Sequence, residues 1–600
     1  MPLSPESTFL YSFLGLVSAW SRARFGQSGW AAGTNTGVTS SPHHPSPRRG
    51  ERDAAPGRDA LAVSGAVVGI VTALVALGVA QLVAAILSSP IGAPISAVGE
   101  LSINHTPGAV KNFAIREFGS DDKTVLVWGI RGVLIIFAVI IGILAVRKLW
   151  YGAAGLAVFG AIGVYAALSQ PTSKATDALP SIIGAAVAFF AMSYFSRRAV
   201  SLVASRRARA RAAPPPAAPP EAGQGPIWRQ LESARTSPGP APDRRKFLLA
   251  GVAVAGVSLL TYAGGSWLGE SRDVNAIQKV LKLPRPAKAA PPLPPGVNLN
   301  VPGLSSFITP NSSFYRVDTA IVLPEILPAS WHLRVHGMVS KELVLTFDDL
   351  IRRPLIEDYI TLCCVSNPVG GPYIGNAKWL GASLRSLLQE AGIKAGADQL
   401  FCTSSDGFTS GTPVEFAMDG RDALLAVAMN DAALPVEHGF PARLVIPGLY
   451  GYVSACKWIV DIEVTTYQQN VSYWAQRGWD PQATVKTESR IDVPTGQNSL
   501  TAGKPVAIAG VAWAQHKGIE AVEVRVEGSS WQPAKLAEVP GLDTWRQWVY
   551  EWDANVKPGN YLIEARATDK TGYTQTSLQE PPEPNGATGY PNVEVNVAAS

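Results

Sequence analysis

Residues 361–381 read TLCCVSNPVGGPYIGNAKWLG and contain two of the four cysteines of this 600-residue chain. The other two, Cys402 and Cys456, follow in the same half of the chain. Because no C-x-x-C pair occurs, the signatures of a zinc ribbon, a thioredoxin-type redox site and a c-type haem site are missing. Two interpretations of the adjacent Cys363 and Cys364 remain. One is a thiolate ligand for a soft metal centre, and the other is a disulfide with Cys402 or Cys456, or inert buried thiols.

Two further stretches flank this one: TPNSSFYRVDT at 309–319 and EHGFPARLVIPGLYGYVSACKW at 437–458. Together with the Cys-x-x-Asn segment that follows a Thr-Leu pair, they make the chain resemble the sulfite oxidase family of molybdenum enzymes, particularly its membrane-anchored actinobacterial-type members. The resemblance runs over residues 300–600. It implies an oxidoreductase that depends on Mo-molybdopterin, with one pterin per molybdenum.

The resemblance implies that Cys364 is the catalytic residue and the one protein ligand of the metal, with Cys363 facing away. A soft, anionic thiolate suits a metal that is otherwise held by dithiolene sulfurs. The phosphate and pterin need polar donors, and arginine suits bidentate phosphate binding whereas lysine acts as a point charge. A surface salt bridge is the alternative role of each basic residue. The cofactor-binding residues that the resemblance implies are Tyr315, Arg316, Asn367, Thr403, His438, Arg443, Ser454 and Lys457.

The chain departs from the family pattern at one position that bears on the substrate. Sulfite oxidases place an arginine directly after the Cys-x-x-Asn segment to help bind the sulfite anion, and this chain has Pro368 there. Lys378 is the remaining candidate for a positive charge in the substrate pocket. We therefore expect two-electron oxygen-atom transfer on a sulfoxide, an N-oxide or a sulfite-like small molecule.

The second half of the chain has the composition of water-soluble domains. Residues 299–483 mix short β-branched runs with the helical pattern LGASLRSLLQEAG at 380–392, which predicts an α+β molybdopterin domain. Residues 484–600 alternate strand-like runs with Gly and Pro turns, which predicts an immunoglobulin-like β-sandwich. Its four clearest strands are expected at 506–513, 521–528, 545–553 and 561–569. The sandwich resembles the family's dimerisation domain, so the resemblance implies a homodimer.

The first half is too apolar for a soluble protein. The whole chain is 47% hydrophobic and only 16% charged, against about 25% charged in ordinary globular domains. Residues 60–87 carry no charge, and about 20 apolar residues are enough to cross a bilayer. Similar runs predict four transmembrane helices within 59–196 and a fifth at 246–266. The five apolar runs are 60–87, 124–146, 151–168, 180–196 and 247–265.

Basic residues predict how these helices are oriented. They precede the first run, separate the second run from the third, and form a cluster at 197–211 after the fourth. These basic flanks should lie on the cytoplasmic side, beside membrane lipid. Arg244-Arg245 before the fifth run resembles a twin-arginine signal. We therefore expect a multi-pass protein of the cell membrane whose catalytic domain is extracytoplasmic. The remaining segments are expected to be a disordered 1–58, a basic and Pro/Ala-rich cytoplasmic linker at 197–245, and a second linker at 267–298.

Three further expectations concern partners. The net charge of +5 is small for 600 residues, so no nucleic-acid partner is expected. No histidine falls within a span, so no haem is expected and a separate electron donor or acceptor is needed. Two other functions remain as alternatives: a catalytically silent, membrane-tethered binding protein that works through its sandwich, and a transporter. A transporter should carry coupling charges within its spans, and only Arg131 is present there.

Overall fold

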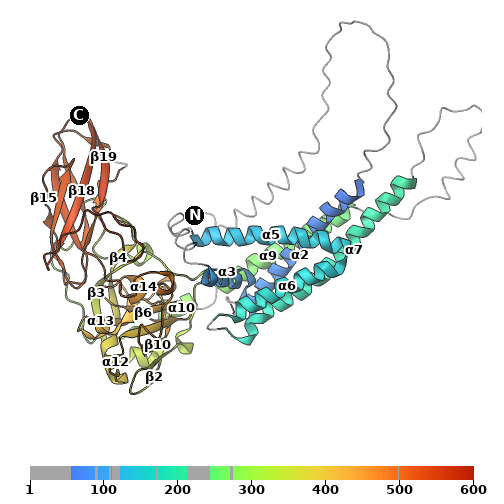
Figure 1. The fold of residues 1–600 in the computed structure, drawn as a ribbon, viewed down its shortest axis with the longest axis horizontal. Coiled ribbons are helices and arrows are strands. Elements are labelled where there is room, and N and C mark those ends of the chain that lie inside the picture. Colours follow the sequence, from blue (N-terminus) through green and yellow to red (C-terminus); the bar gives the residue numbers. More distant parts are fainter. Residues whose placement is uncertain are drawn as a thin grey trace, which may run out of the picture. The chain divides into compact units, whose positions relative to one another are not determined.

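The protein is described from a computed structural model (Figure 1). Most of the expected disordered segment 1–58, and the larger part of the expected linker 197–245, lie outside the described residues. The described residues are 56–87, 89, 92–106, 110, 122–170, 173–212, 244–270, 274–496 and 499–599.

Long apolar helices make up the first half of the described chain. By length and composition four of them are able to cross a membrane, over Leu61–Ile86, Lys123–Arg147, Leu149–Leu168 and Ala175–Ser205. The fifth expected span falls in α9, whose described apolar part is the shorter Gly251–Gly264, so this span stays a prediction. The helices of this half are α2 (Pro56–Ile86), α3 (Pro94–His105), α5 (Asp122–Arg147), α6 (Leu149–Leu168), η3 (Ala175–Ala178), α7 (Leu179–Ala212) and α9 (Arg244–Glu270).

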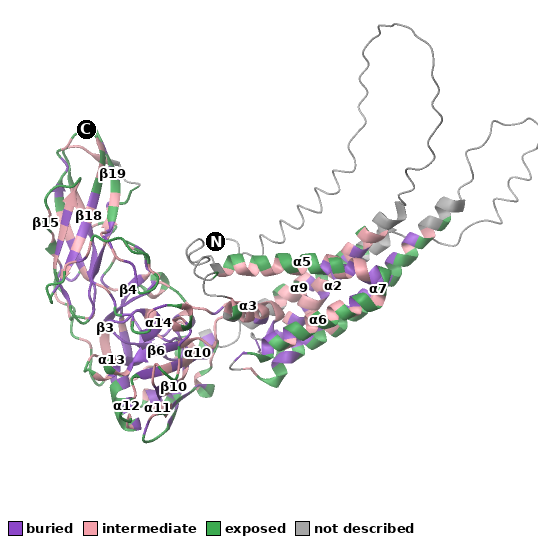
Figure 2. Ribbon diagram, viewed as in Figure 1, coloured by how far each residue is buried: buried purple, intermediate pink, exposed green. Residues whose placement is uncertain are grey.

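Small residues let the backbones of these helices approach closely. A Cβ at Gly69 of α2 would overlap the carbonyl of Ala138 in α5, and one at Gly142 would overlap the carbonyl of Gly65. Such packing is typical of membrane helices, which gain little from the hydrophobic effect and depend on close contact. Large apolar residues of these helices are exposed, including Phe190 at 71%, and Figure 2 colours much of α5, α6 and α7 as exposed or intermediate. The bundle therefore has the surface expected of helices that face lipid.

Two boundaries differ from the sequence-based expectation. Helix α7 does not end at 196 but continues through the arginine cluster to Ala212, because Ala and Arg are both strong helix formers. The expected linker 267–298 also contains helical turns, since α9 ends at Glu270 and α10 spans Val274–Val280. Gln278 of α10 donates to the carbonyls of Ala433 and Leu434, which ties this helix to the α+β domain.

The α+β domain is built on one mixed sheet and one antiparallel sheet. One has the order β2-β1-β10-β5-β6, in which β1 and β10 pair in parallel, and the other has the order β3-β4-β7-β8, with β9 also on β7. The expected helix near 380–392 is confirmed as α12, which Ser383 caps at its start and Gly392 ends in a left-handed conformation. The strands are β1 (His332–Gly337), β2 (Leu343–Thr346), β3 (Leu355–Cys363), β4 (Ile374–Ser383), β5 (Gln399–Ser404), β6 (Thr409–Pro413), β7 (Leu424–Met429), β8 (Ala432–Ala433), β9 (Arg443–Val445) and β10 (Ile459–Thr465). The helices are η4 (Asn311–Ser313), η5 (Pro328–Ser330), α11 (Phe347–Ile351), α12 (Leu384–Ala391), α13 (Val414–Met418), η6 (Val436–His438), α14 (Gly451–Ser454) and η7 (Ala475–Arg477).

The C-terminal part is an all-β sandwich, as expected. Its sheets have the orders β11-β13-β17-β16 and β12-β19-β18-β14-β15, and buried residues from both sheets form one core. Figure 2 colours the buried parts of its strands, such as β18, purple. The four expected strands correspond to β13, β14, β17 and β18, because alternation of apolar residues is a local signal. The strands are β11 (Glu488–Val493), β12 (Ser499–Thr501), β13 (Pro505–Trp513), β14 (Ile519–Val526), β15 (Gln532–Pro533), β16 (Lys535–Leu536), β17 (Arg546–Asp553), β18 (Gly559–Asp569) and β19 (Asn592–Ala598).

Candidate functional site

Cys364 lies directly after the end of strand β3. Its backbone N–H donates to the Tyr373 carbonyl at 2.9 Å, and its carbonyl accepts from the Asn367 N–H at 3.1 Å, which closes a tight turn. All four cysteines are buried free thiols, so the structure does not support the disulfide interpretation. The ligand candidate therefore remains available for a metal.

The Cys364 thiol is buried, and polar groups around it partly offset the effect of burial on its pKa. Burial raises its pKa, while hydrogen bonding to Ser366 and the positive charge of Lys457 act in the opposite direction. The thiol is thus protonated when nothing is bound, and a metal ion that binds it displaces that proton.

Asn367 offers a second group for a ligand beside Cys364. Its Oδ1 accepts a hydrogen bond from the Tyr373 N–H at 2.8 Å, which fixes the side chain. Its Nδ2 is buried and finds no partner among the described residues. Because a buried unpaired donor is costly, this atom suits a site that is completed by a bound molecule.

Arg443, the first residue of β9, is a buried cation. Its side chain donates to the carbonyls of His438 at 3.0 Å, Ala455 at 3.3 Å and Leu444 at 3.3 Å, and it lies over the Trp379 ring at 5.2 Å. None of the ion pairs found among the described residues includes it. Burial lowers its pKa to about 10, so it is still charged at neutral pH. A buried cation held only by carbonyls fits an anionic group such as a phosphate.

Aromatic rings connect Arg443 to the segment that carries Tyr315. The Phe314 ring stacks on Tyr315 with centroids 5.2 Å apart and meets Trp379 and His438 edge-on at 5.9 and 5.5 Å. Burial and the positive charge of Arg443 lower the His438 pKa to about 4, so His438 is neutral and donates or accepts without adding charge. Its Nε2 lies 3.2 Å from the Asn311 carbonyl.

Lys457 supplies the second buried cation. Its Nζ lies 2.7 Å from Asp318 Oδ2 and 3.1 Å from the Glu437 carbonyl. Burial lowers its pKa to about 8 despite the carboxylate of Asp318. The thiol of Cys364, the amide of Asn367 and the cations of Arg443 and Lys457 are therefore a donor set that fits a molybdopterin cofactor with a thiolate ligand and an anionic phosphate.

Comparison with known proteins agrees with this donor set. The family model described as "Oxidoreductase molybdopterin binding domain" matches residues 320–474. The chain is 30% identical over 322 residues to the sulfite oxidase of Gallus gallus, covering 46% of this chain and 69% of that protein. The chain belongs to the sulfite oxidase family of molybdopterin-dependent oxidoreductases.

Two other similarities are more partial. The mitochondrial sulfite oxidase of Drosophila melanogaster is 27% identical over 363 residues, which are 51% of this chain and 60% of that protein. This chain thus spans less than two thirds of that relative. The sulfane dehydrogenase SoxCD from Paracoccus pantotrophus aligns with a TM-score of 0.43 and 25% identity, over 49% of this chain and 84% of that chain. Membership in the sulfite oxidase family supports an enzyme.

The structure does not bring every expected residue of the sulfite oxidase motif to the same place. Ser454 is buried, and its hydroxyl donates to the carbonyls of Leu449 and Tyr450, so it stabilises the short helix α14. Thr403 is half-buried in β5, opposite Asp461 of β10 and Thr409 of β6. Lys378 pairs with Glu357 at 3.3 Å and Asp431 at 2.5 Å. The expectation that Lys378 adds positive charge to the pocket is therefore not supported.

Sequence reasoning missed two residues of the site. Asp318 pairs with Lys457 and also with Arg316, at 2.8 Å. Its position two residues after Arg316, in a stretch already selected for its basic and aromatic residues, was the available signal. Trp379 lies under Arg443, and it belongs to the stretch 361–381.

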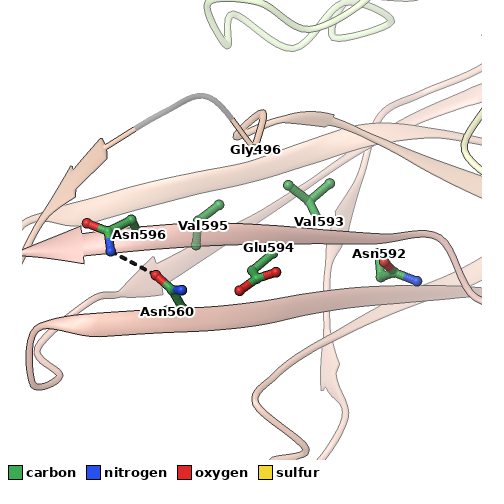
Figure 3. A pocket seen from close by; sticks show the side chains of 7 residues that line it. All are labelled: Gly496, Asn560, Asn592, Val593, Glu594, Val595 and Asn596. Carbon is green, nitrogen blue, oxygen red and sulfur yellow. Dashed lines mark hydrogen bonds between the residues drawn. The ribbon is translucent and has the colours of Figure 1, made fainter.

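The sandwich carries a separate open cavity of about 550 Å³, shown in Figure 3. It is lined by Asn560 of β18, residues 592–596 of β19 and Gly496, and Asn596 donates to Asn560 at 2.8 Å. Glu594 is its one ionisable lining residue, and it contains neither a thiol nor a cation. Its chemistry does not fit an anionic molybdenum cofactor, so the Cys364 region remains the site.

Proposed function

We propose that this chain is a membrane-anchored, extracytoplasmic molybdopterin enzyme that reduces a small neutral oxide, such as a sulfoxide or an N-oxide. The net reaction takes up two electrons and two protons, cleaves the bond from sulfur or nitrogen to oxygen, and releases water. The observation that carries the substrate class is that Lys378 and Arg490 are each paired with carboxylates, while Pro368 stands where the family has an arginine.

The residues of the site divide into three roles. Cys364 provides the thiolate ligand, and Asn367 donates its unpaired N–H to the bound group. Arg443 and Lys457 bind the phosphate of the cofactor. When bound, Mo-molybdopterin supplies the two-electron change and the oxygen exchange, while the protein supplies position and charge.

The charges around the Cys364 turn favour a neutral substrate. Pro368 stands where the family has an arginine, and Lys378 is neutralised by Glu357 and Asp431. Arg490 reaches the turn through a hydrogen bond to the Gly371 carbonyl at 3.2 Å, but its Nε is 2.6 Å from Asp492. An anion such as sulfite would need a cation that is not already paired.

The location is supported by the charges that flank the helices and by two contacts. The loop between the first two spans is expected outside the cytoplasm; Glu100 in α3 within this loop and Lys123 at its end bind residues 318–321 of the catalytic domain. Segments in contact must share one side of the membrane. A separate electron donor, and a homodimer through the sandwich, complete the proposal.

A substrate screen of the purified full-length protein in detergent tests this function. Reduced dye is supplied with dimethyl sulfoxide, methionine sulfoxide or trimethylamine N-oxide, and sulfite is supplied with an electron acceptor. We expect turnover of at least one neutral oxide and a lower kcat/KM for sulfite. Turnover of sulfite alone would overturn the proposed substrate class.

A further inference from the structure

We propose that Lys123, at the start of membrane helix α5, is a positioning residue of the cofactor site: it neutralises Asp318 and so leaves Lys457 and Arg316 available to the anionic cofactor. The inference rests on the proposed cofactor site. It gives the membrane part a role beyond anchoring, because a residue from a transmembrane helix then sets how tightly the catalytic domain holds its cofactor.

Asp318 contacts both membrane helix α5, through Lys123, and the candidate cofactor site, through Lys457. Its side chain is only 3% exposed and contacts three cations. Lys123 Nζ lies 2.5 Å from Oδ1, whereas Lys457 Nζ and Arg316 Nε lie 2.7 and 2.8 Å from Oδ2. Membrane helix and cofactor site therefore share one carboxylate, and Arg316 Nη2 also lies 3.4 Å from the Oδ1 that Lys123 binds.

Asp318 is ionised in this arrangement. Burial opposes its charge, but Lys457, Lys123 and Arg316 together hold its pKa well below the usual range. The neighbouring carboxyl of Asp406 has a pKa that burial raises, so it competes less for Lys457. The four ion-paired groups thus carry three positive charges and one negative charge.

The net charge of these four groups determines how strongly they attract the phosphate of the cofactor. An anionic cofactor that binds Lys457 and Arg316 competes with Asp318 for the same donors. With Lys123 present, the net charge of Lys123, Lys457, Arg316 and Asp318 is +2. Without Lys123 the net charge of the other three groups is +1, and Lys457 and Arg316 are then the only two of these cations left to pair with Asp318. Loss of Lys123 should therefore weaken cofactor binding although Lys123 itself does not touch the cofactor.

The same segment is held by a second membrane-side contact. Lys123 Nζ also donates to the Ala320 carbonyl at 2.8 Å, and Glu100 of α3 accepts from the Ile321 N–H at 2.5 Å. Helices α3 and α5 therefore both bind residues 318–321, which directly follow Tyr315 and Arg316. These contacts fix the segment on which the competition depends.

If Lys123 acts by neutralising Asp318, removal of the Asp318 charge should cancel the effect of removing Lys123. This compensation distinguishes the proposed role from simple docking. The full-length variants are Lys123→Gln, Asp318→Asn and the double variant, with Lys148→Gln, directly after the other end of α5, as the matched control. The readouts are molybdenum and pterin per chain after purification, and the rate of pterin release followed by fluorescence. We expect release from Lys123→Gln to be about tenfold faster, release from Asp318→Asn to be no faster than from wild type, and the double variant to return to within about twofold of wild type. Lys123→Arg should behave as wild type.

A docking role predicts a different pattern, because removal of either partner breaks the same contact. Faster release from Asp318→Asn, equal to that from Lys123→Gln and not relieved in the double variant, would overturn the inference. So would a Lys123→Gln protein that releases pterin at the rate of Lys148→Gln. Wild-type protein without pterin would instead contradict the proposed function, so the two failures are distinguishable.

Discussion

The ammonium of Lys457 and the carboxylate of Asp318 form a buried ion pair at 2.7 Å, although the two residues are 139 positions apart. This pair joins the segment of Tyr315 and Arg316 to the loop that follows β9. The two stretches that flank the cysteine segment in the sequence are thereby brought to one site. What that site binds, and how its neighbours support it, can be measured with single substitutions.

Substitution of Pro368 by arginine should shift the enzyme towards sulfite. Pro368 is exposed, and its carbonyl accepts the Gly371 N–H at 2.8 Å, a bond that any residue at 368 retains. Residue 368 is in none of the ion pairs found among the described residues, so an arginine there should be available to bind an anion. We therefore expect the KM for sulfite to fall about tenfold and the KM for a neutral sulfoxide to change little. Steady-state kinetics of Pro368→Arg and the control Pro368→Ala measure this. An unchanged ratio of the two KM values would contradict the electrostatic account of specificity.

Gly375 leaves room for the aromatic cluster beside the site. A Cβ there would lie 2.7 Å from the Phe314 ring, which packs on Tyr315 and His438. Gly375→Ala should cost about 1–3 kcal/mol through overpacking and reduce the pterin content of the purified protein. Thermal unfolding and pterin analysis measure both effects.

Two controls separate this effect from the mere addition of a methyl group. A Cβ at Gly541 would meet no atom within 4 Å, so Gly541→Ala should be neutral. The double variant Phe314→Leu with Gly375→Ala should recover part of the lost stability because the smaller side chain makes room. If Gly375→Ala and Gly541→Ala behave alike, the aromatic cluster does not constrain the site.

Glu488 of β11 should make stability depend on pH. Its side chain is buried and its Oε1 has no partner among the described residues, so burial raises its pKa to about 8 while Lys486 lowers it. Between the ordinary glutamate pKa and about pH 8, Glu488 is protonated in the folded state and ionised in the unfolded chain. This group therefore stabilises the protein at acidic pH, and that contribution is lost as the pH rises through 8.

Glu488→Gln removes this dependence. Relative to wild type, the variant should gain several degrees of Tm between pH 6 and pH 9, because the amide needs no proton to remain neutral. Thermal unfolding at both pH values provides the measurement. Parallel Tm curves for the two proteins would show that Glu488 is ionised or solvated in the folded state.

Sequence reasoning was most successful where the signal is local. Strands such as β13 and β18 follow from alternation of apolar residues, and α12 follows from its spacing and from Gly392. Cys364, Arg443 and Lys457 were selected because short motifs carry their chemistry. Each of these signals is contained in a few consecutive residues.

Contacts between distant segments could not be predicted in the same way. Lys123 and Asp318 are 195 positions apart, and nothing in either segment specifies the other as its partner. Lys378 was a candidate for a positive charge in the substrate pocket, because its sequence neighbours do not reveal Glu357 and Asp431 beside it. The arginines at 197–211 were interpreted as a linker, although their helix propensity extends α7.

The most direct test of the central claim compares the two adjacent cysteines. Molybdenum and pterin are measured per chain in wild type, Cys364→Ser and Cys363→Ser, expressed in cells that make the cofactor, together with oxide reduction. We predict about one molybdenum per chain and full activity for wild type and Cys363→Ser, and loss of activity with lowered molybdenum for Cys364→Ser. Equal molybdenum and activity in the two serine variants, or a wild-type protein without molybdenum, would contradict the account.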